Sequence, residues 1–509
     1  MRLAVDWRAS CSLAGTVCKY LALPFAAPAL VAVYYGEDPL PFLVAAAAAV
    51  AVGVGLERLD ADPEIRHREA FLLVGLAWLV VPLLGTIPYL VSGQGTVAHP
   101  TNALFESMSG FTTTGATVMG EISVERHSRA LLLWRQLTQW LGGMGIVVLM
   151  VAILPDLSVG GAQLVKEEAP GIEVEKLTPR IRQTAAALWK IYAGLTVACI
   201  GVYYGLHLLG VAPNMGVYNA VAHGLTTLPT GGFSPEARSI EAFSPAVQWA
   251  VIPFMVAAGT NFALFWYVLR GEFGRLVGNA EFRSYLLAMA AVGLLVVGLL
   301  FSGVGLAGAP SVAPIPGNVE RSLRQGLFQV VAIVTTTGYA SMDFNTWSDV
   351  GKLVLLFGMF LGGSAGSAAG SVKILRWYVV GKSIRRELYT TVHPEAVRPI
   401  RLSGTVVDED TVREVAVFTL LFVGTFAVSA VALFVESHRA GPDLSALEAT
   451  SVAAATLGNV GPGFGVVGPM NGFTPFSVPA KLYMVALMWA GRLELLSVVV
   501  LFTPAYWRR

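Results

Sequence analysis

Charge is scarce in this sequence. Lys, Arg, Asp and Glu make up only 13% of the 509 residues, whereas hydrophobic residues make up 55%. A water-soluble domain carries about one quarter charged residues, so this composition excludes a soluble globule and predicts an integral membrane protein. The formal net charge of +1 leaves no excess of either sign that would attract nucleic acid or an acidic substrate. We therefore expect a lipid bilayer around the chain and no nucleic-acid partner.

Groups for covalent or metal chemistry are also scarce. The sequence has seven His and three Cys, and Cys11, Cys18 and Cys199 lie in apolar segments without paired or metal-ligand spacing. We interpret the three cysteines as small buried hydrophobes. No residue cluster supplies the acid, base, nucleophile or metal ligands of an intramembrane enzyme, and no predicted strand precedes a glycine-rich phosphate turn. The sequence therefore predicts a protein that is not an enzyme and has no cofactor.

Long apolar runs, in contrast, are abundant. A helix that spans a membrane needs about 20 mostly apolar residues. Ten stretches qualify, near residues 11–34, 39–57, 69–92, 131–154, 184–209, 246–269, 282–304, 351–380, 412–435 and 479–503. Of the 34 Lys and Arg residues, 23 fall on the side that holds both termini and six on the other side. Because positive charge favours the cytoplasmic side, we expect a multi-pass plasma-membrane protein with both termini in the cytoplasm.

Four loops on the expected outer side share one pattern. They read LFESMSGFTTTGAT, AVAHGLTTLPTGGFS, LFQVVAIVTTTGYAS and TSVAAATLGNVGPGFG. The glycines chosen by register are Gly115, Gly231, Gly338 and Gly461, which are 116, 107 and 123 residues apart. Pro229 and the neighbouring Gly232 leave the choice within the second loop open. A single TTTG is weak evidence, but four such loops on one side of the membrane predict a tandem repeat.

The predicted fold is all-α, with four tandem helix–pore-loop–helix repeats around one central pore and two extra transmembrane helices before them. We expect the extra pair in residues 1–60 and the repeats in residues 61–160, 161–275, 276–400 and 401–509, the third with an intramembrane gating loop. Each pore loop re-enters the membrane as a half-helix and a glycine turn. Such a turn must be buried or line water, because lipid satisfies no backbone hydrogen bond.

Backbone carbonyls are the expected ion ligands. Glycine reaches the left-handed conformations that turn successive carbonyls toward one axis, and rings of carbonyls replace the water around a large monovalent cation. The negative ends of the half-helices favour a cation as well. None of the four turns contains the Asp or Glu that a calcium or magnesium site requires. The predicted ion-binding residues are Thr113, Thr114, Gly115, Thr230, Gly231, Thr336, Thr337, Gly338, Asn459, Val460 and Gly461.

At this point the motifs resemble a known family. WRQLTQWLGGMGI at 134–146, KLTPRIRQTAAALWKIY at 176–192, LGGSAGSAAGSVKILR at 361–376 and GRLEL at 491–495 accompany the four turns. Together they are similar to the superfamily of potassium transporters that includes Trk, Ktr and plant HKT proteins, and the extra N-terminal helix pair is similar to that of the Trk membrane subunit. The resemblance implies potassium uptake through a carbonyl-lined selectivity filter. Glycine in all four turns implies a preference for potassium over sodium.

The resemblance also implies an assembly with regulated opening. Members of this superfamily form homodimers in which each subunit has its own pore. A separate cytoplasmic regulatory subunit of the TrkA type, which binds nucleotide, gates the Trk pore. The sequence itself contains no nucleotide-binding motif, so such regulation would come from a second polypeptide.

The apolar segment 351–380 is too long for one span and is interrupted by small residues. The candidate gate comprises Gly362, Gly363, Gly366, Gly370, Lys373 and Arg492. The small residues favour backbone that unwinds within the membrane, although close helix packing explains them too. The resemblance implies a loop that blocks the pore. We expect Arg492 to hold this loop through backbone carbonyls, or else to pair with Glu494. Lys373 either anchors the loop or ends a solvated helix.

Three polar residues precede the turns. Glu106 and Gln329 each lie nine residues before their glycine, and they either support the filter by hydrogen bonds from behind or face water at the pore mouth. His223 is interpreted as a structural residue rather than a proton sensor.

A secondary transporter for organic solutes is the main competing function, but its repeats are usually inverted or comprise several spans. The residues alone leave open whether conduction is channel-like or coupled to protons or sodium.

Overall fold

The fold is almost entirely helical. A computed structural model describes residues 5–63, 66–152, 177–402 and 405–508. Within these residues the only sheet is a two-stranded antiparallel hairpin of β1 (Arg401–Leu402) and β2 (Thr405–Val406). The all-α prediction is therefore confirmed.

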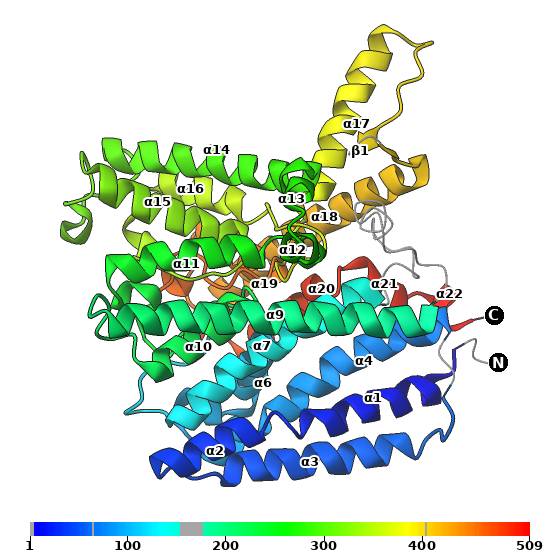
Figure 1. Ribbon diagram of the computed structural model, residues 1–509, viewed down its shortest axis with the longest axis vertical. Coiled ribbons are helices and arrows are strands. Elements are labelled where there is room, and N and C mark those ends of the chain that lie inside the picture. The colour runs from blue at the N-terminus through cyan, green and yellow to red at the C-terminus, as the bar shows by residue number, and fades with distance from the viewer. Residues whose placement is uncertain (1–4, 64–65, 153–176, 403–404, 509) are drawn as a thin grey trace.

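The first part of the chain forms a group of helices at the lower edge of Figure 1. They are α1 (Trp7–Leu21), α2 (Ala26–Tyr35), α3 (Leu40–Glu57), α4 (His67–Gly85) and α5 (Ile87–Ser92). Glycines let α1 and α3 approach closely, because a Cβ on Gly15 would lie 2.6 Å from the Gly53 carbonyl oxygen. The charged ends of this pair meet in the Lys19–Glu57 ion pair of 2.6 Å.

Longer and shorter helices alternate through the rest of the chain. The first half continues with η1 (Gly95–Ala98), α6 (Pro100–Phe111), α7 (Arg129–Ala152), α9 (Leu177–Leu208), α10 (Val217–Thr227), η3 (Ser239–Ala242), α11 (Pro245–Ala258) and α12 (Phe262–Leu269). The second half comprises α13 (Phe273–Gly278), α14 (Ala280–Ser302), η4 (Pro310–Val312), α15 (Val319–Val334), η5 (Phe344–Thr346), α16 (Asp349–Gly358), α17 (Ile374–Val392), α18 (Glu409–Ala440), α19 (Ala446–Leu457), η6 (Gly465–Val467), α20 (Val478–Arg492), α21 (Leu496–Leu501) and α22 (Pro504–Trp507).

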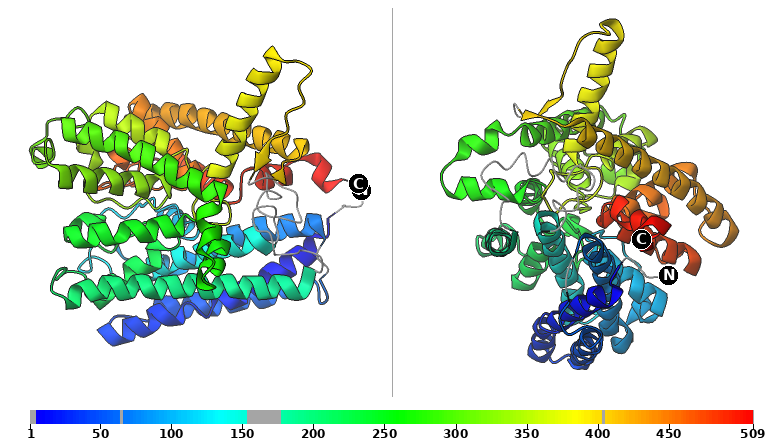
Figure 2. Two further views of the ribbon diagram at one scale, coloured as in Figure 1. Left: turned by 45° about the horizontal axis from the view of Figure 1, so that its top comes forward. Right: turned by 90° about the vertical axis from the view of Figure 1, so that its right-hand side faces the viewer.

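Four of the short helices end in the glycine turns. Helices α6, α10, α15 and α19 contain 12, 11, 16 and 12 residues. At a rise of about 1.5 Å per residue, none of them reaches across a hydrocarbon core of about 30 Å. The right-hand view in Figure 2 shows the chain running around a common centre, from blue and cyan below through green and yellow to orange and red.

The helices that can span a membrane are fewer than the ten predicted. In the described residues six helices are long and apolar enough, and a seventh span arises if α11 and α12 are counted together. That pair is bent by 101°, so 246–269 is not one straight span. The predicted interruption of 351–380 is confirmed, because the chain is irregular between Gly358 and Ile374. The predicted single span at 479–503 is wrong, because α20 and α21 are separate helices.

These breaks have local causes. Asn261 caps α12 through the Ala263 N–H at 2.9 Å, and the Phe262 N–H bonds to the carbonyl of Gly366, a distant segment. Between α20 and α21, Glu494 adopts a left-handed φ of 57°, which a helix cannot accommodate. The remaining predicted stretch, 131–154, corresponds to α7.

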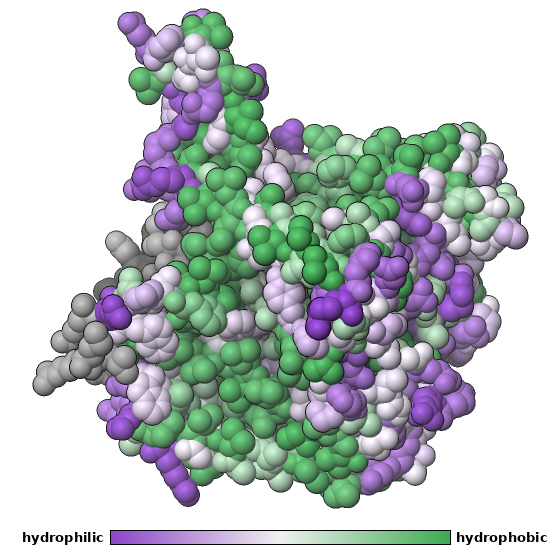
Figure 3. Space-filling model, turned by 180° about the vertical axis from the view of Figure 1, so that it is seen from behind, coloured by the Kyte–Doolittle hydropathy of each residue, from purple (hydrophilic) through white to green (hydrophobic). Residues whose placement is uncertain are grey.

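Many large hydrophobic side chains are exposed on the surface. Figure 3 shows hydrophobic side chains over the middle of one face, with hydrophilic ones mostly toward its left and right margins. The first residues of α1 and α4 lie beside α22, because the Asp6 N–H bonds to Glu69 Oε1 at 2.8 Å and the Tyr506 hydroxyl bonds to the Arg68 carbonyl at 2.5 Å. The beginning and the end of the chain thus meet at one end of the molecule (Figure 1).

Substituting Gly15 tests the contact between α1 and α3. Gly15→Val places its Cβ 2.6 Å from the Gly53 carbonyl oxygen, and overpacking of this kind costs about 1–3 kcal/mol. We expect a lower thermal unfolding temperature in detergent, followed by tryptophan fluorescence. Gly55→Val on α3 is the matched control, because its Cβ would meet nothing within 4 Å. Equal unfolding temperatures for the two variants would contradict close packing at Gly15.

Candidate ion pathway

The four turns share one pattern of left-handed residues. A non-glycine residue with left-handed φ is followed two positions later by a glycine with left-handed φ. The pairs are Thr113 and Gly115, Thr230 and Gly232, Thr336 and Gly338, and Asn459 and Gly461, with φ between 51° and 101°. Left-handed φ is costly for residues with a Cβ, so four repetitions of this pattern mark a shared and demanding geometry.

The second turn corrects the predicted register by one residue. Gly232, rather than Gly231, matches Gly115, Gly338 and Gly461. The N–H groups of Gly232, Gly338 and Gly461 also each bond to the carbonyl six residues earlier. Gly231 instead matches Thr114, Thr337 and Val460. The sequence does contain a signal for this register, because Thr230 precedes Gly232 by two positions, as Thr113 precedes Gly115.

The four turns contact one another in a closed cycle. A Cβ on Gly115 would lie 2.2 Å from the Gly231 carbonyl oxygen, and one on Gly232 would lie 1.9 Å from that of Thr337. A Cβ on Gly338 would lie 2.1 Å from the Val460 carbonyl oxygen. One on Gly461 would lie 2.6 Å from the Thr114 carbonyl oxygen, which closes the cycle. Real Cβ atoms do not approach backbone so closely, so glycine is required by space as well as by φ.

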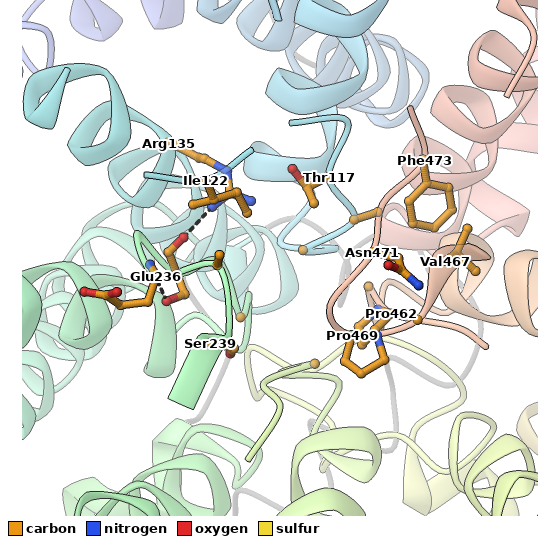
Figure 4. A pocket seen from close by; sticks show the side chains of 18 residues that line it. Thr117, Ile122, Arg135, Glu236, Ser239, Pro462, Val467, Pro469, Asn471 and Phe473 are labelled. Carbon is orange, nitrogen blue, oxygen red and sulfur yellow. Dashed lines mark hydrogen bonds between the residues drawn. The ribbon is translucent and has the colours of Figure 1, made fainter. Parts of the chain in front are cut away.

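A single pocket opens onto all four glycines. Gly115, Gly232, Gly338 and Gly461 line it together. Figure 4 shows its wall, where Thr117 follows the first turn, Glu236 and Ser239 follow the second, and Pro462, Pro469 and Asn471 follow the fourth. The four glycine turns therefore line one pocket together with loops that are distant in the sequence.

Side chains of three short helices brace the segments that follow the first, third and fourth turns. Glu106 accepts a 2.8 Å hydrogen bond from the Val118 N–H, and Gln329 accepts one of 2.9 Å from the Ser341 N–H. Both side chains are fully buried, so the predicted support from behind is confirmed and the water-facing alternative is wrong. In the fourth turn the Ser451 hydroxyl accepts a 2.9 Å bond from the Phe464 N–H. Each of these N–H groups lies three residues after the glycine.

The second turn is braced differently. Three residues after Gly232 stands Pro235, which has no N–H to donate. His223, nine residues before Gly232, instead bonds to the Ser234 hydroxyl at 2.9 Å through Nε2 and to the Asn219 carbonyl at 2.7 Å through Nδ1. Both ring nitrogens are engaged, which agrees with the structural interpretation of His223.

A buried ion pair that the sequence analysis missed joins the first and second turns. Arg135 of α7 pairs with Glu106 at 2.6 Å, and both side chains are almost completely buried. Arg135 also donates to the Ser234 carbonyl at 2.9 Å (Figure 4) and lies 3.6 Å from the centre of the Phe233 ring. Burial lowers the pKa of the nearby His127 to about 4, with a further contribution from Arg135, so at pH 7 the imidazole is neutral and adds no positive charge beside the guanidinium.

The irregular segment between α16 and α17 packs against the third and fourth turns. The Gly370 N–H donates to the Thr336 hydroxyl at 2.7 Å, and a Cβ on Gly370 would lie 2.6 Å from the Gly458 carbonyl oxygen. Arg492 donates to the Ala368 carbonyl at 2.8 Å. Lys373 is buried and donates to the Ala369 carbonyl. The predicted gate residues are therefore brought together directly behind the turns.

The alternatives for this segment are resolved by its contacts. Glu494 pairs with Arg376 and not with Arg492, so Arg492 holds a backbone carbonyl as predicted. Lys373 is not at a solvated helix end, because it is only 5% exposed. Close packing also occurs, since a Cβ on Gly362 would lie 2.5 Å from the Gly370 oxygen. The small residues thus serve both an irregular backbone and tight packing.

Comparison with known proteins decides the family. A family model described as TrkH, a cation transport protein, matches residues 42–509. The chain belongs to the TrkH family. This membership makes it a multi-pass membrane transporter rather than an enzyme.

Two relatives and one solved structure illustrate the similarity. The Trk system potassium uptake protein TrkH of Halomonas elongata is 35% identical, over 97% of this chain and 98% of the relative. The protein of the same name in Escherichia coli K12 is 36% identical over 87% of each chain. The crystal structure of the potassium transporter TrkH from Vibrio parahaemolyticus is 32% identical, with a TM-score of 0.85, and the match covers 99% of this chain and 100% of that one.

Breaking the buried ion pair tests the brace in this TrkH-family protein. Glu106→Ala leaves the Arg135 guanidinium buried without its carboxylate, which typically costs about 3–5 kcal/mol. We expect a large fall in thermal unfolding temperature. Arg413→Ala is the control, because the Arg413–Asp410 pair is 75% and 71% exposed and such pairs contribute about 0–1 kcal/mol. Similar small shifts in both variants would contradict the proposed brace.

Proposed function

We propose that this protein takes up potassium ions across the plasma membrane through a selectivity filter made by the four glycine turns. The closed cycle of glycine-to-carbonyl contacts is the observation that carries the proposal. The cycle brings backbone carbonyls from four separate parts of the chain close to one another. Rings of carbonyls suit a dehydrated monovalent cation. The names of the relatives, Trk system potassium uptake proteins, support potassium as the transported ion.

The four turns divide the chain into four repeats around one pore. In this proposal residues 1–60 form the extra helix pair, and residues 61–160, 161–275, 276–400 and 401–509 each supply a short helix, a turn and flanking spans. The proposed filter comprises Gly232 and the predicted ion-binding residues, which are Thr113, Thr114, Gly115, Thr230, Gly231, Thr336, Thr337, Gly338, Asn459, Val460 and Gly461. The short helices α6, α10, α15 and α19 each end at a turn, so their negative ends add a field that favours a cation there.

The irregular segment 362–373 is proposed as the gate. It contacts Thr336 and Gly458, which lie in the third and fourth turns, and Arg492 and Lys373 hold its carbonyls. The Arg492 guanidinium raises the energy of a potassium ion that leaves the filter, because like charges repel strongly in a low-dielectric surrounding. Conduction then requires the segment and Arg492 to move.

The surroundings follow from the same proposal. Both termini lie in the cytoplasm, the protein is a homodimer, and a separate nucleotide-binding subunit of the TrkA type moves the gate. The shared location of α1 and α22 at one end of the molecule supports a common side for the termini. The words "Trk system" in the names of the relatives support a transporter of several components.

Rubidium uptake into liposomes loaded with potassium chloride tests the filter. The purified protein should take up radioactive rubidium, and external potassium but not sodium should block the uptake. In Gly115→Ser the new Cβ meets the Gly231 oxygen at 2.2 Å, and we expect discrimination between potassium and sodium to fall by about tenfold, equivalent to about 1.4 kcal/mol. Gly194→Ser, whose Cβ meets nothing within 4 Å, should retain it. Equal discrimination in all three proteins would refute a filter at Gly115.

Removing the arginine tests the gate. Arg492→Ala eliminates the bond to the Ala368 carbonyl and the positive charge behind the filter. We expect several-fold faster rubidium uptake without any partner protein, because each 1.4 kcal/mol removed from a barrier raises the rate about tenfold. Arg275→Ala is the control, because its pair with Glu272 is half-exposed. No uptake in wild type and in Arg492→Ala alike would reject the potassium pathway itself.

A further inference from the structure

The second turn differs from the other three at one position. Gly231 stands where the other turns carry the β-branched residues Thr114, Thr337 and Val460. The backbone does not require glycine there, because Gly231 lacks the left-handed φ that Gly232 has. Some other feature must therefore exclude a side chain at residue 231.

The excluded space is filled by Gln139. A Cβ on Gly231 would lie 2.3 Å from both Cδ and Oε1 of Gln139 and 2.8 Å from its Nε2. The Gln139 side chain, fully buried on α7, thus occupies the volume that a side chain of the turn itself would take. Because this neighbour is a side chain anchored at both ends of its amide, the second turn can contain only glycine here.

Both halves of the Gln139 amide bind the turn. Nε2 donates to the Gly231 carbonyl at 2.7 Å, and Oε1 accepts from the Phe233 N–H at 3.1 Å. The Gly231 carbonyl oxygen is also the atom against which Gly115 packs. One side chain therefore fixes the peptide groups on both sides of Gly232 and, through Gly231, the contact between the first and second turns.

We infer that Gln139 is a positioning residue that sets the cation discrimination of the second turn by orienting the Gly231 carbonyl. The inference rests on the proposed function, in which this carbonyl belongs to the filter. Among the described residues, only this one of the four equivalent carbonyls accepts a side-chain hydrogen bond. The Gln139 amide N–H occupies one of the two lone pairs of the Gly231 carbonyl oxygen. This carbonyl is therefore a weaker cation ligand than the carbonyls of Thr114, Thr337 and Val460.

The second turn depends on this outside support. Pro235 removes the N–H that the other turns offer to their short helices, and two adjacent glycines leave the backbone free to rotate. Helix α7 supplies the missing bonds, because Arg135 and Gln139 are four residues apart and lie on one face. Gly143, one turn further along, lets α7 come close, since its Cβ would be 2.4 Å from Pro229 Cβ.

A double-mutant cycle tests the inference. The proteins are wild type, Gln139→Ala, Gly231→Thr and the double variant, with rubidium uptake inhibited by potassium or by sodium as the readout. Gln139→Ala should lower the ratio of potassium to sodium inhibition by about tenfold, the usual scale for one uncompensated buried hydrogen bond. Gly231→Thr should abolish uptake through its 2.3 Å collision. The double variant should regain uptake, because the threonine enters the space that the amide has left.

Two further variants separate hydrogen bonding from volume. Gln139→Met keeps the volume without the hydrogen bonds and should lose discrimination as Gln139→Ala does. Gln136→Ala removes a buried amide from the same helix, one with no hydrogen-bond partner among the described residues, and should keep the wild-type ratio. Wild-type discrimination in Gln139→Met, an equal loss in Gln136→Ala, or a double variant no better than Gly231→Thr would each overturn the inference.

A second readout is independent of the gate. Potassium should raise the thermal unfolding temperature of wild-type protein in detergent more than sodium does, and Gln139→Ala should reduce this difference. If wild type shows neither potassium-selective uptake nor potassium-selective protection, the proposed filter itself fails. If wild type shows both and Gln139→Ala matches it, the filter stands and the role of Gln139 is refuted.

Discussion

A membrane interior offers no hydrogen bonds to peptide groups, and the rest of the structure depends on this constraint. Non-helical backbone is tolerated there only where protein or water satisfies it. The four turns and the segment between α16 and α17 have irregular backbone that is buried within the protein. They lie together. The Gly370 N–H donates to the Thr336 hydroxyl, and the Ser364 N–H donates to the Gly259 carbonyl. Irregular segments far apart in the sequence thus satisfy one another.

Buried charges follow the same constraint. A buried guanidinium is costly unless it is paired or hydrogen-bonded. Arg135 has Glu106 and a backbone carbonyl of the second turn, whereas Arg492 ends α20 and reaches across to Ala368. The cation at the last turn of α20 is also favoured by the negative end of that helix. Arg135 therefore links two turns through a carboxylate and a backbone carbonyl, whereas Arg492 holds the segment before α17 through the Ala368 carbonyl.

The sequence predicted features that depend on local composition. Apolar runs predicted the helices, small residues predicted the interruption of 351–380, and glycines marked the four turns. It did not predict the 101° bend between α11 and α12, because the carbonyl that receives the Phe262 N–H belongs to Gly366. The sequence analysis also placed the second register one residue early, because Thr230 followed by Gly231 has the same spacing as Thr114 followed by Gly115, and the glycine with left-handed φ is Gly232. Arg135 and Gln139 were missed because their partners are 29 and 92 residues away.

The four turns keep one pattern of left-handed φ although their braces differ. Glu106, Gln329 and Ser451 perform the same task with a carboxylate, an amide and a hydroxyl. In the second turn His223 of α10 and two side chains of α7, Arg135 and Gln139, take its place. The glycine contacts do not vary in this way, because each glycine leaves room for the carbonyl of the next turn and a single side chain would break the cycle. A brace needs only one donor and one acceptor, which several residue types supply, whereas the cycle needs empty space. Space is therefore the stricter requirement. It explains why glycine recurs in all four turns, whereas the bracing residues differ from one turn to the next.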